Sequence, residues 1–359
     1  MSALITTLPE LASAAEALAG NAALGLDTEF MRERTYYAQL CLLQLAGDGL
    51  AVCIDPLALD SLAALRPLME AGTPCKILHA ARQDLEVLAP AIGTVRNIFD
   101  TQVGAALIGL PAQIGYADLV QELLGIHLHK SQTRTDWSRR PLSAAQLEYA
   151  IDDVRHLLPL RERLSERLGK LGRHAWFEEE MRELGAASFA IDPQQAWRRI
   201  KSFADLDSDR QRLAQQLCAW REQRAISSNR PRGWIIPDAA LRDLVFQVPR
   251  SRAALAQLRE LPEGIRENSG AVLLELIDAA QMPEPPAPLP PRRRPDPEQI
   301  ATVTRLAETT RRKATELSLA PELLATRRDM ERLAGGERDC AMLSGWRREV
   351  IGAALLNAL

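Results

Sequence analysis

The chain has 359 residues, of which 47% are hydrophobic and 4% aromatic, with 44 Lys and Arg against 47 Asp and Glu. At roughly 150 residues per domain, this length predicts two or three domains. The hydrophobic fraction excludes a wholly disordered chain. No apolar run approaches about 18 residues, so we expect no membrane-spanning helix.

Charge is distributed unevenly along the chain. Residues 1–170 carry a net charge of −5 and residues 285–359 carry +3, within a total of −3. This excludes a strongly basic chain that binds nucleic acid through its overall field. Five scattered cysteines form no C-x-x-C pair, and the N-terminus has no signal-peptide pattern. We therefore expect a cytoplasmic protein with reduced thiols, without a disulfide or zinc framework.

The N-terminal half alternates short apolar runs with helical patterns. Strands are predicted at 24–30, 38–47, 50–56, 75–80 and 95–99. Gly-Asp-Gly at 47–49 is typical of a hairpin turn between the second and third of these strands. Helices are predicted at 57–71 and 81–90. This order indicates a mixed sheet flanked by helices, an α/β fold.

The remainder of the chain is predicted to be all-α. Leu/Ala/Arg/Glu-rich segments with helical periodicity follow residue 170. A proline-rich linker at 283–297 separates two helical modules, because proline lacks a backbone donor and disrupts helices and sheets. Residues 235–245 and 319–330 show a faint internal similarity. This similarity indicates either a repeated module or chance resemblance between Ala/Leu/Arg-rich helices.

Three acidic side chains accompany the predicted strands. Asp27 and Glu29 lie two apart in an extended run, so both side chains leave the same face of the sheet. Asp84 follows a later strand, at the start of a helix. Burying such carboxylates is costly without a cation, which makes them candidate metal ligands. The alternatives are a solvated edge strand for the pair and an ordinary first-turn acid for Asp84.

A helix predicted within residues 141–164 carries a fourth acid. Ser143 and Gln146 form a capping-box pattern at its start. Tyr149 and Asp153 lie four apart, so they project about 40° from each other on one face, whereas Asp152 lies about 100° further round. A phenol beside a carboxylate can hold a water near a metal. The alternative is a surface Tyr–Asp pair.

Taken together, the ordered acids resemble the DEDD-type 3′→5′ exonucleases in their tyrosine variant, and the chain resembles the ribonuclease D family in particular. The similar segments are LDTEFMRERTYYAQLCLLQ (26–44), HAARQDLEVL (79–88), IFDTQVGAAL (98–107), KSQTRTDWSRRPLS (130–143) and YAIDDVRHL (149–157). Residues 217–245 are similar to the helicase-and-RNase-D C-terminal (HRDC) domain.

The resemblance implies a division into domains. It predicts a ribonuclease-H-like exonuclease domain at 1–170 and a helical connector at 171–204. An HRDC-like domain follows at 205–282, then the linker at 283–297 and a second, degenerate HRDC-like domain at 298–359.

The resemblance also implies the chemistry. Asp27, Glu29, Asp84 and Asp153 match the acids that bind two divalent ions, Mg²⁺ or Mn²⁺, and Tyr149 matches the tyrosine that positions the attacking water. The expected enzyme is a 3′→5′ exoribonuclease that releases 5′-mononucleotides. Its expected partner is RNA with a free 3′ end, including tRNA precursors, with no membrane and no obligate protein partner implied.

Other residues are candidates for contact with the substrate, each with a structural alternative. His79 is also explained as a hydrogen-bonded histidine at a strand end, Phe30 as a core residue and Trp137 as an anchor for the following helix. Asp100 fits helix capping or substrate support better than metal ligation. The full set of substrate-binding candidates is Phe30, Gln44, His79, Lys130, Trp137, Arg139, Arg140, Arg230 and Arg232.

Two alternative functions remain at this point. A DNA 3′→5′ exonuclease would use the same four acids, since discrimination of RNA depends on groups that recognise the 2′-OH. A non-catalytic RNA-binding scaffold is the other alternative, which a missing carboxylate would have favoured. None is missing.

Overall fold

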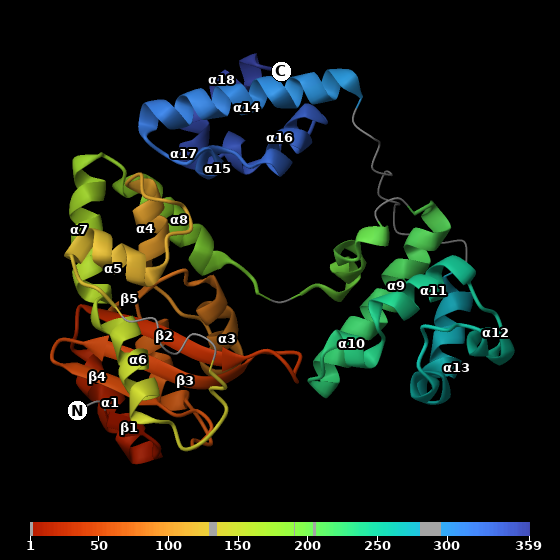
Figure 1. Ribbon diagram of the computed structural model, residues 1–359, viewed down its shortest axis with the longest axis horizontal. Coiled ribbons are helices and arrows are strands. Elements are labelled where there is room, and N and C mark those ends of the chain that lie inside the picture. The colour runs from red at the N-terminus through yellow and green to blue at the C-terminus, as the bar shows by residue number, and fades with distance from the viewer. Residues whose placement is uncertain (1–2, 129–134, 190, 204–205, 281–295) are drawn as a thin grey trace. The chain divides into compact units, whose positions relative to one another are not determined.

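The computed structural model describes residues 3–128, 135–189, 191–203, 206–280 and 296–359. The chain forms two compact units (Figure 1). The first comprises Met1–Met31, Leu40–Ala187 and Pro295–Leu359. The second comprises Arg32–Gln39 and Ser188–Arg294.

The first unit is built on a six-stranded mixed sheet. The strands lie in the order β1-β4-β3-β2-β5-β6. β3 and β4 are antiparallel, whereas β1 pairs parallel with β4, and β5 pairs parallel with both β2 and β6. Their bounds are β1 Ala3–Ile5, β2 Ala23–Met31, β3 Gln39–Gly47, β4 Leu50–Ile54, β5 Cys75–Leu78 and β6 Ile98–Asp100.

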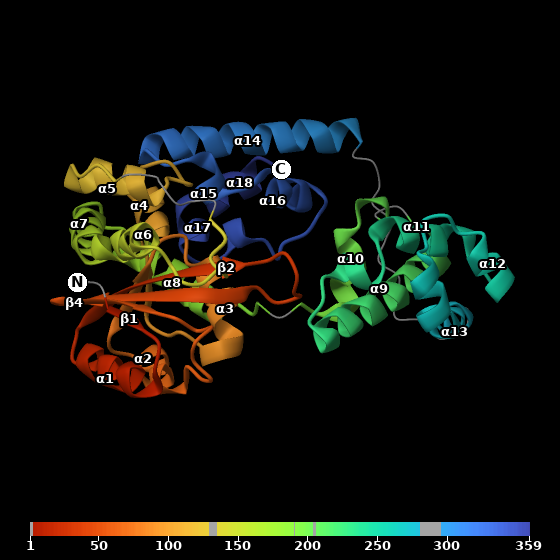
Figure 2. The same cartoon turned by 60° about the horizontal axis from the view of Figure 1, so that its bottom comes forward.

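Helices cover both faces of this sheet. In Figure 2, α1 and α2 lie below it and α5, α6 and α7 lie above it. The bounds are α1 Leu8–Ala19, α2 Arg66–Glu70, α3 Arg82–Ile92, α4 Thr101–Leu107, α5 Tyr116–Leu124, α6 Ala144–Arg155, α7 Leu157–Lys170 and α8 His174–Ala186. The predicted α/β fold with a mixed sheet is confirmed.

Local sequence explains how the main elements begin and turn. Gly47 pairs with Leu50 across a two-residue turn in which Gly49 has a φ of +75°, a conformation that favours glycine. The predicted hairpin is therefore confirmed. Ser143 and Gln146 form the predicted capping box at the start of α6.

Two predicted elements differ from the structure. The helix predicted at 57–71 is limited to a short 3₁₀ turn at Ala63–Leu65 and α2, because the chain turns after Asp55, whose carboxylate accepts the backbone N–H of Leu57 at 3.0 Å. The strand predicted at 95–99 begins only at Ile98, because Asn97 has a φ of +53°. The short strand β1 was not predicted.

The C-terminal helices complete the first unit. α14 and the helices after it share one hydrophobic core with α7 and α8, to which Leu164, Phe177, Leu306 and Trp346 all contribute. The indole rings of Trp176 and Trp346 stack with centroids 4.7 Å apart. The bounds are α14 Pro297–Leu317, α15 Pro321–Leu324, α16 Arg327–Ala334, α17 Gly345–Arg347 and α18 Ala353–Asn357.

The second unit is helical, apart from the segment Arg32–Gln39 that joins β2 to β3. Its core is formed by α9, α11 and α13 together with the 3₁₀ turn Pro193–Arg199, which packs against α9, and the 3₁₀ turn Lys201–Phe203. The bounds are α9 Ser208–Ser228, α10 Arg232–Ile235, α11 Asp238–Gln247, α12 Arg252–Ala256 and α13 Glu263–Ala279. No strand follows residue 100 in the described part of the chain.

The helical segments repeat a pattern at a fixed interval. α9 and α14 both have 21 residues, and each ends on a left-handed residue, Asn229 and Ser318 respectively. α15 and α16 begin 89 positions after α10 and α11. None of the helices in the described residues is long and apolar enough to cross a membrane.

Candidate active site

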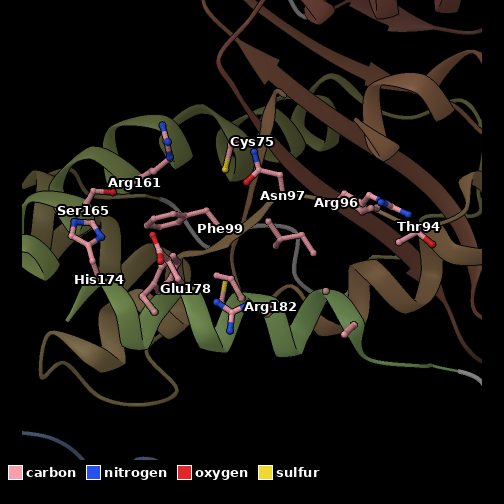
Figure 3. Close-up of a pocket in the computed structure, with 16 residues that line it drawn as sticks. Cys75, Thr94, Arg96, Asn97, Phe99, Arg161, Ser165, His174, Glu178 and Arg182 are labelled. Carbon is pink, nitrogen blue, oxygen red and sulfur yellow. The ribbon is translucent and has the colours of Figure 1, made fainter. Parts of the chain in front are cut away.

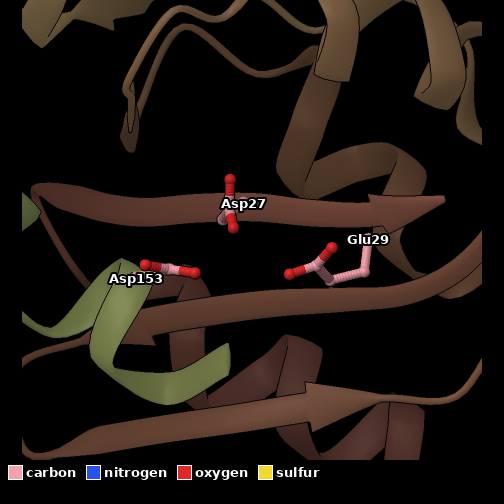
Figure 4. Close-up of side chains that lie close together, drawn as sticks. All are labelled: Asp27, Glu29 and Asp153. Atoms are coloured by element: carbon pink, nitrogen blue, oxygen red, sulfur yellow. The ribbon is translucent and has the colours of Figure 1, made fainter. Parts of the chain in front are cut away.

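Three carboxylates converge above the centre of the sheet. Asp27 and Glu29 leave one face of β2, as their spacing predicts, and Asp153 reaches them from α6 (Figure 4). One oxygen of each carboxylate lies within 4.8 Å of the others. The two-residue period of β2 places Asp27 and Glu29 on one face, and α6 adds Asp153, so three carboxylates come together.

Asp84 lies next to this group, in the first turn of α3. Its side chain is 93% shielded from solvent, and its carboxylate accepts a hydrogen bond of 2.5 Å from the Thr28 hydroxyl. Thr28 lies between Asp27 and Glu29 on β2 and was not singled out from the sequence. It links α3 to the strand that carries the acidic pair.

The electrostatics of the site reflect one buried acid, Asp84, and three half-buried acids beside it. Burial, followed by repulsion from Asp84, Asp153 and Glu29, raises the pKa of Asp27 well above its ordinary range. Burial and the neighbouring carboxylates raise the pKa of Glu29 to about 8. Burial also raises the pKa values of Asp84 and Asp153 to about 7. Such a group requires protons or cations to offset its charge.

Tyr149 lies beside Asp153 on α6 and forms a hydrogen bond with it. Burial and the surrounding carboxylates raise the pKa of Tyr149, so its phenol stays protonated at neutral pH. Asp152 instead forms an ion pair of 2.6 Å with Arg155. The sequence-based choice of Asp153 over Asp152 agrees with this geometry.

Two residues position the backbone around the site. The Asp100 carboxylate caps α4 and also accepts the backbone N–H groups of Ala80 and Ala81, which lead into α3. Helix capping by Asp100 is therefore confirmed. The Tyr116 hydroxyl donates to the carbonyl oxygen of Asp152 at 2.9 Å, next to Asp153. Sequence reasoning missed Tyr116, because it lies on α5 with no recognisable spacing to the acids.

Several predicted substrate contacts are corrected by burial. Gln44 is completely buried, so it does not face nucleic acid, and its amide has no hydrogen-bond partner among the described residues. His79 contacts the hydroxyl of Thr101 and the carbonyl of Ile114 with its two ring nitrogens, at 2.9 and 3.0 Å. Gln44 and His79 are therefore engaged within the fold and are not exposed contacts for RNA.

Trp137 and Arg140 are corrected in the same way. Trp137 is 4% exposed and packs near the Tyr149 ring, with centroids 6.1 Å apart, as expected for an anchor. The Arg140 guanidinium binds both carboxylate oxygens of Asp55, at 2.6 and 2.7 Å. Arg140 is therefore committed to a structural ion pair.

In the second unit, Arg232 is also engaged. Its guanidinium binds both oxygens of the buried Glu222, at 2.6 and 2.7 Å, and lies over the Tyr36 ring. The Tyr36 hydroxyl donates to the same carboxylate. Arg232 therefore stabilises the segment Arg32–Gln39 against α9, and a phosphate contact by this residue is not supported.

Three of the remaining substrate-binding candidates are accessible to solvent, and a fourth lies outside the described residues. Arg139 has 84% of its side chain exposed, Arg230 is exposed and Phe30 is half-buried. Lys130 lies outside the described residues. Beside Arg230, Trp234 is 61% exposed, which makes it the most exposed of the large hydrophobic side chains in the described segments.

The donor set of the site suits divalent cations. Four carboxylates provide only oxygen ligands, which Mg²⁺ and Mn²⁺ prefer. Burial raises their pKa values first, and repulsion between the carboxylates adds to this for Asp27 and Glu29; a bound cation would offset that repulsion. We conclude that Asp27, Glu29, Asp84 and Asp153 fit a divalent metal centre.

Known proteins show the same organisation. Residues 3–169 match the 3′–5′ exonuclease family, and residues 210–277 match the HRDC domain. Ribonuclease D from Granulibacter bethesdensis is 39% identical over 97% of this chain and 90% of its own length. Ribonuclease D from a Jannaschia species is 40% identical over 99% and 94%, respectively.

A solved structure agrees over the whole chain. Escherichia coli RNase D, described as an exoribonuclease involved in structured RNA processing, has a TM-score of 0.92 and 31% identity over 100% of this chain and 98% of its own. The two family matches, the relatives and this structure agree, and the chain therefore belongs to the ribonuclease D family.

Proposed function

We propose that this protein is a 3′→5′ exoribonuclease that removes nucleotides one at a time from RNA 3′ ends and releases 5′-mononucleotides. The observation that carries the proposal is the convergence of Asp27, Glu29 and Asp153 within 4.8 Å, with Asp84 beside them. Membership of the ribonuclease D family supports the choice of RNA over DNA.

Two divalent ions, Mg²⁺ or Mn²⁺, are proposed as cofactors. Asp27, Glu29, Asp84 and Asp153 would hold them. When bound, the ions supply a polarised water and stabilise charge on the leaving 3′ oxygen. Thr28 fixes the orientation of the Asp84 carboxylate through its 2.5 Å hydrogen bond.

Tyr149 is proposed to orient the attacking water. Because its raised pKa keeps the phenol protonated, Tyr149 cannot act as a general base at neutral pH. Its O–H donates to Asp153, and its oxygen can accept a hydrogen bond from the water. Its hydroxyl is held at Asp153, so a water placed by Tyr149 lies beside the carboxylates. Tyr116 holds the α6 backbone at Asp152 and thereby supports this geometry.

We propose precursors of tRNA and other structured RNAs as substrates, in the cytoplasm. The description of the E. coli relative as a processor of structured RNA supports the first part. The cysteines of the chain support the second, because all five are free thiols and are buried, as in a reducing compartment.

Arg230 and Trp234 are the proposed RNA contacts of the second unit. Both are exposed, and they are separated by one turn of backbone around the short helix α10. A guanidinium can bind a phosphate, and an exposed indole can stack on a base. Arg139 is a third candidate, at the active-site unit.

Residues 298–359 are proposed to be a second HRDC-like domain. The interval of 89 residues between α9–α11 and α14–α16 supports a duplication, including aspartate caps at Asp207 and Asp296. Its core is continuous with that of α7 and α8, so the duplicated domain would have become part of the catalytic unit.

A single experiment tests the activity. Purified protein is incubated with a 5′-labelled single-stranded RNA and Mn²⁺ or Mg²⁺, with EDTA and a 3′-blocked RNA as controls. We expect a metal-dependent ladder that shortens from the 3′ end and stops at the block. Cleavage of the blocked RNA would indicate an endonuclease, whereas tight binding without cleavage would favour a scaffold.

A further inference from the structure

A cavity lies at the opposite end of strands β5 and β6 from the carboxylates. It has a volume of about 690 Å³ and is lined by Cys75, residues 94–99, α7 and α8. Cys75 is the first residue of β5, whereas Asp84 follows the last. We call it the β6 cavity; no residue of the carboxylate group lines it.

The wall of the β6 cavity is cationic. Arg96, Arg161 and Arg182 line it together with His174, against one carboxylate, that of Glu178 (Figure 3). None of the three arginines has an ion-pair partner within the described residues. Arg161 on α7 and Arg182 on α8 line the cavity from two helices, whereas Arg96 lies apart from them beside Thr94, and an anion in the cavity would be attracted to both helical arginines.

Arg161 provides the most specific observation. Its guanidinium lies 5.9 Å from the centroid of the Phe99 ring, and its buried Nε has no hydrogen-bond acceptor among the described residues. A buried, unsatisfied donor on a charged group is costly. Ser165 lies one turn further along α7 and faces the same cavity, where it adds a hydroxyl donor.

The donors fit a phosphate group. Guanidinium groups bind phosphate oxygens with paired, charge-assisted hydrogen bonds. The cavity also has an apolar wall, to which Val95, Ile98 and Met181 contribute. Its volume lies in the range of pockets that enclose a small organic ligand, which roughly spans 300–1,000 Å³.

We propose that the β6 cavity binds the phosphate group of a nucleotide, at a site separate from the carboxylates. The ligand carries a phosphate for Arg161 and Arg182 and a base or ribose for the apolar wall. Both a free mononucleotide and a nucleotide within RNA have this chemistry. The inference does not depend on the proposed nuclease activity.

Calorimetric titration of adenosine 5′-monophosphate into the full-length protein in EDTA tests this site without turnover. We expect Arg161→Gln and Arg182→Gln each to weaken binding by about tenfold, because each removes a charge-assisted contact to the phosphate. Arg163→Gln, an exposed arginine on α7 that does not line the cavity, should bind as the wild type does.

The two cavity variants make the result independent of folding. Arg161 packs near Phe99, so its replacement could disturb the fold, whereas Arg182 is exposed at the rim. Loss in both variants, with unchanged circular dichroism, supports the site. No binding by the wild type, unchanged binding in Arg182→Gln, or loss in Asp27→Asn would overturn it.

Two further titrations identify the source of the phosphate. Inorganic phosphate that binds as tightly as the mononucleotide would overturn the role of the apolar wall. In the second titration, the mononucleotide competes with a 3′-blocked RNA. If it displaces the RNA from the wild type but not from Arg182→Gln, the site is assigned to RNA. An RNA that is not displaced would assign it to the free nucleotide.

Discussion

At the scale of single residues, the site depends on charge that the fold concentrates. Asp84 is buried and Asp27, Glu29 and Asp153 are half-buried beside it. Burial raises the pKa values of all four, and the neighbouring carboxylates of the group further raise those of Asp27 and Glu29. The arrangement destabilises the metal-free protein, since hydrophobic residues of similar size would pack at lower cost. Such a cluster is consistent with binding of cations.

Replacement of one carboxylate should abolish turnover without unfolding the protein. We expect Asp153→Asn to lower the rate on labelled RNA by at least about 100-fold, because loss of several kcal/mol of charge stabilisation has that effect. The matched control is Asp152→Asn, which removes the adjacent acid that pairs with Arg155. Equal activities of the two variants would contradict the assignment.

The metal-free protein should lose stability as the pH rises. Folded pKa values of about 7 to 8 for Glu29, Asp84 and Asp153 exceed the unfolded values near 4, so the folded state binds more protons. Between pH 6.5 and 8 the folded carboxylates lose these protons, and the free energy of unfolding should fall. Burial lowers the pKa of the half-buried His79.

Thermal melts in EDTA across this pH range check that sign. The slope of Tm against pH should be smaller in Asp153→Asn. Added Mn²⁺ should raise Tm more at pH 8 than at pH 6.5, because the ionised carboxylates bind it better. A Tm that rises with pH in EDTA would show that the folded carboxylates do not bind more protons than the unfolded ones.

At the scale of elements, buried polar groups hold together segments with little regular structure. Lys76 on β5 is completely buried, and its ammonium group donates to the carbonyl oxygens of Ala71 and Pro74 at 2.8 Å and of Leu68 at 3.4 Å. It therefore closes the connection between α2 and β5. Burial lowers the pKa of Lys76 to about 8.

Lys76→Met should destabilise the protein by about 2 kcal/mol, because it leaves buried carbonyls without donors. Urea denaturation measures the change. Lys170→Met is the control, since Lys170 is largely exposed and pairs with Glu166 on its own helix. A Lys76→Met midpoint equal to that of Lys170→Met would show that water satisfies the carbonyls.

At the scale of the whole molecule, elements distant in sequence share one core. Trp346 is 2% exposed and stacks on Trp176, and its indole N–H donates to Glu180 at 2.7 Å. Arg173 donates to the carbonyls of Leu107 and Leu317, both at 2.6 Å. These contacts attach the C-terminal helices to α4 and α8.

Truncation of Trp346 should release those helices. We expect Trp346→Ala to cost about 3–5 kcal/mol, the range for loss of a buried aromatic side chain, and to expose α14–α18 to proteolysis. Ile300→Ala, which truncates a side chain that is 55% exposed on α14, should have little effect. If α14–α18 stay resistant to proteolysis in Trp346→Ala, contacts other than those of Trp346 attach these helices.

RNA binding should separate the roles of Arg230 and Trp234. On single strands, the logarithm of the binding constant falls by roughly 0.7 per phosphate contact for each tenfold increase in salt. In EDTA, Arg230→Gln should reduce this slope by about that amount. Trp234→Ala should weaken binding by about 1–3 kcal/mol with the slope unchanged, because stacking is neutral.

Exposed Arg259 is the control for that pair. Arg259→Gln removes the same charge from the second unit without removing a proposed contact. If all three variants bind as the wild type does over the full salt range, the second unit does not contact the RNA.

The sequence by itself determined the features that depend on local periodicity. The two-residue period of β2 places Asp27 and Glu29 on one face, and the helical period of α6 places Tyr149 beside Asp153. The capping box at Ser143 and the turn at Gly49 also follow from neighbouring residues. These patterns predict the fold class and place Asp27 with Glu29 and Tyr149 with Asp153, whereas the assignment of all four ligands, Asp84 among them, comes from the family resemblance.

Only the tertiary structure decided which polar residues are free to meet a substrate. Arg140, Arg232 and Gln44 resemble surface groups in the sequence, yet Gln44 is buried and the two arginines pair with acids 85 and 10 positions away. Tyr116 and the β6 cavity depend likewise on contacts between distant elements. Burial and pairing are properties of the packed chain, because they depend on neighbours that the local sequence does not contain.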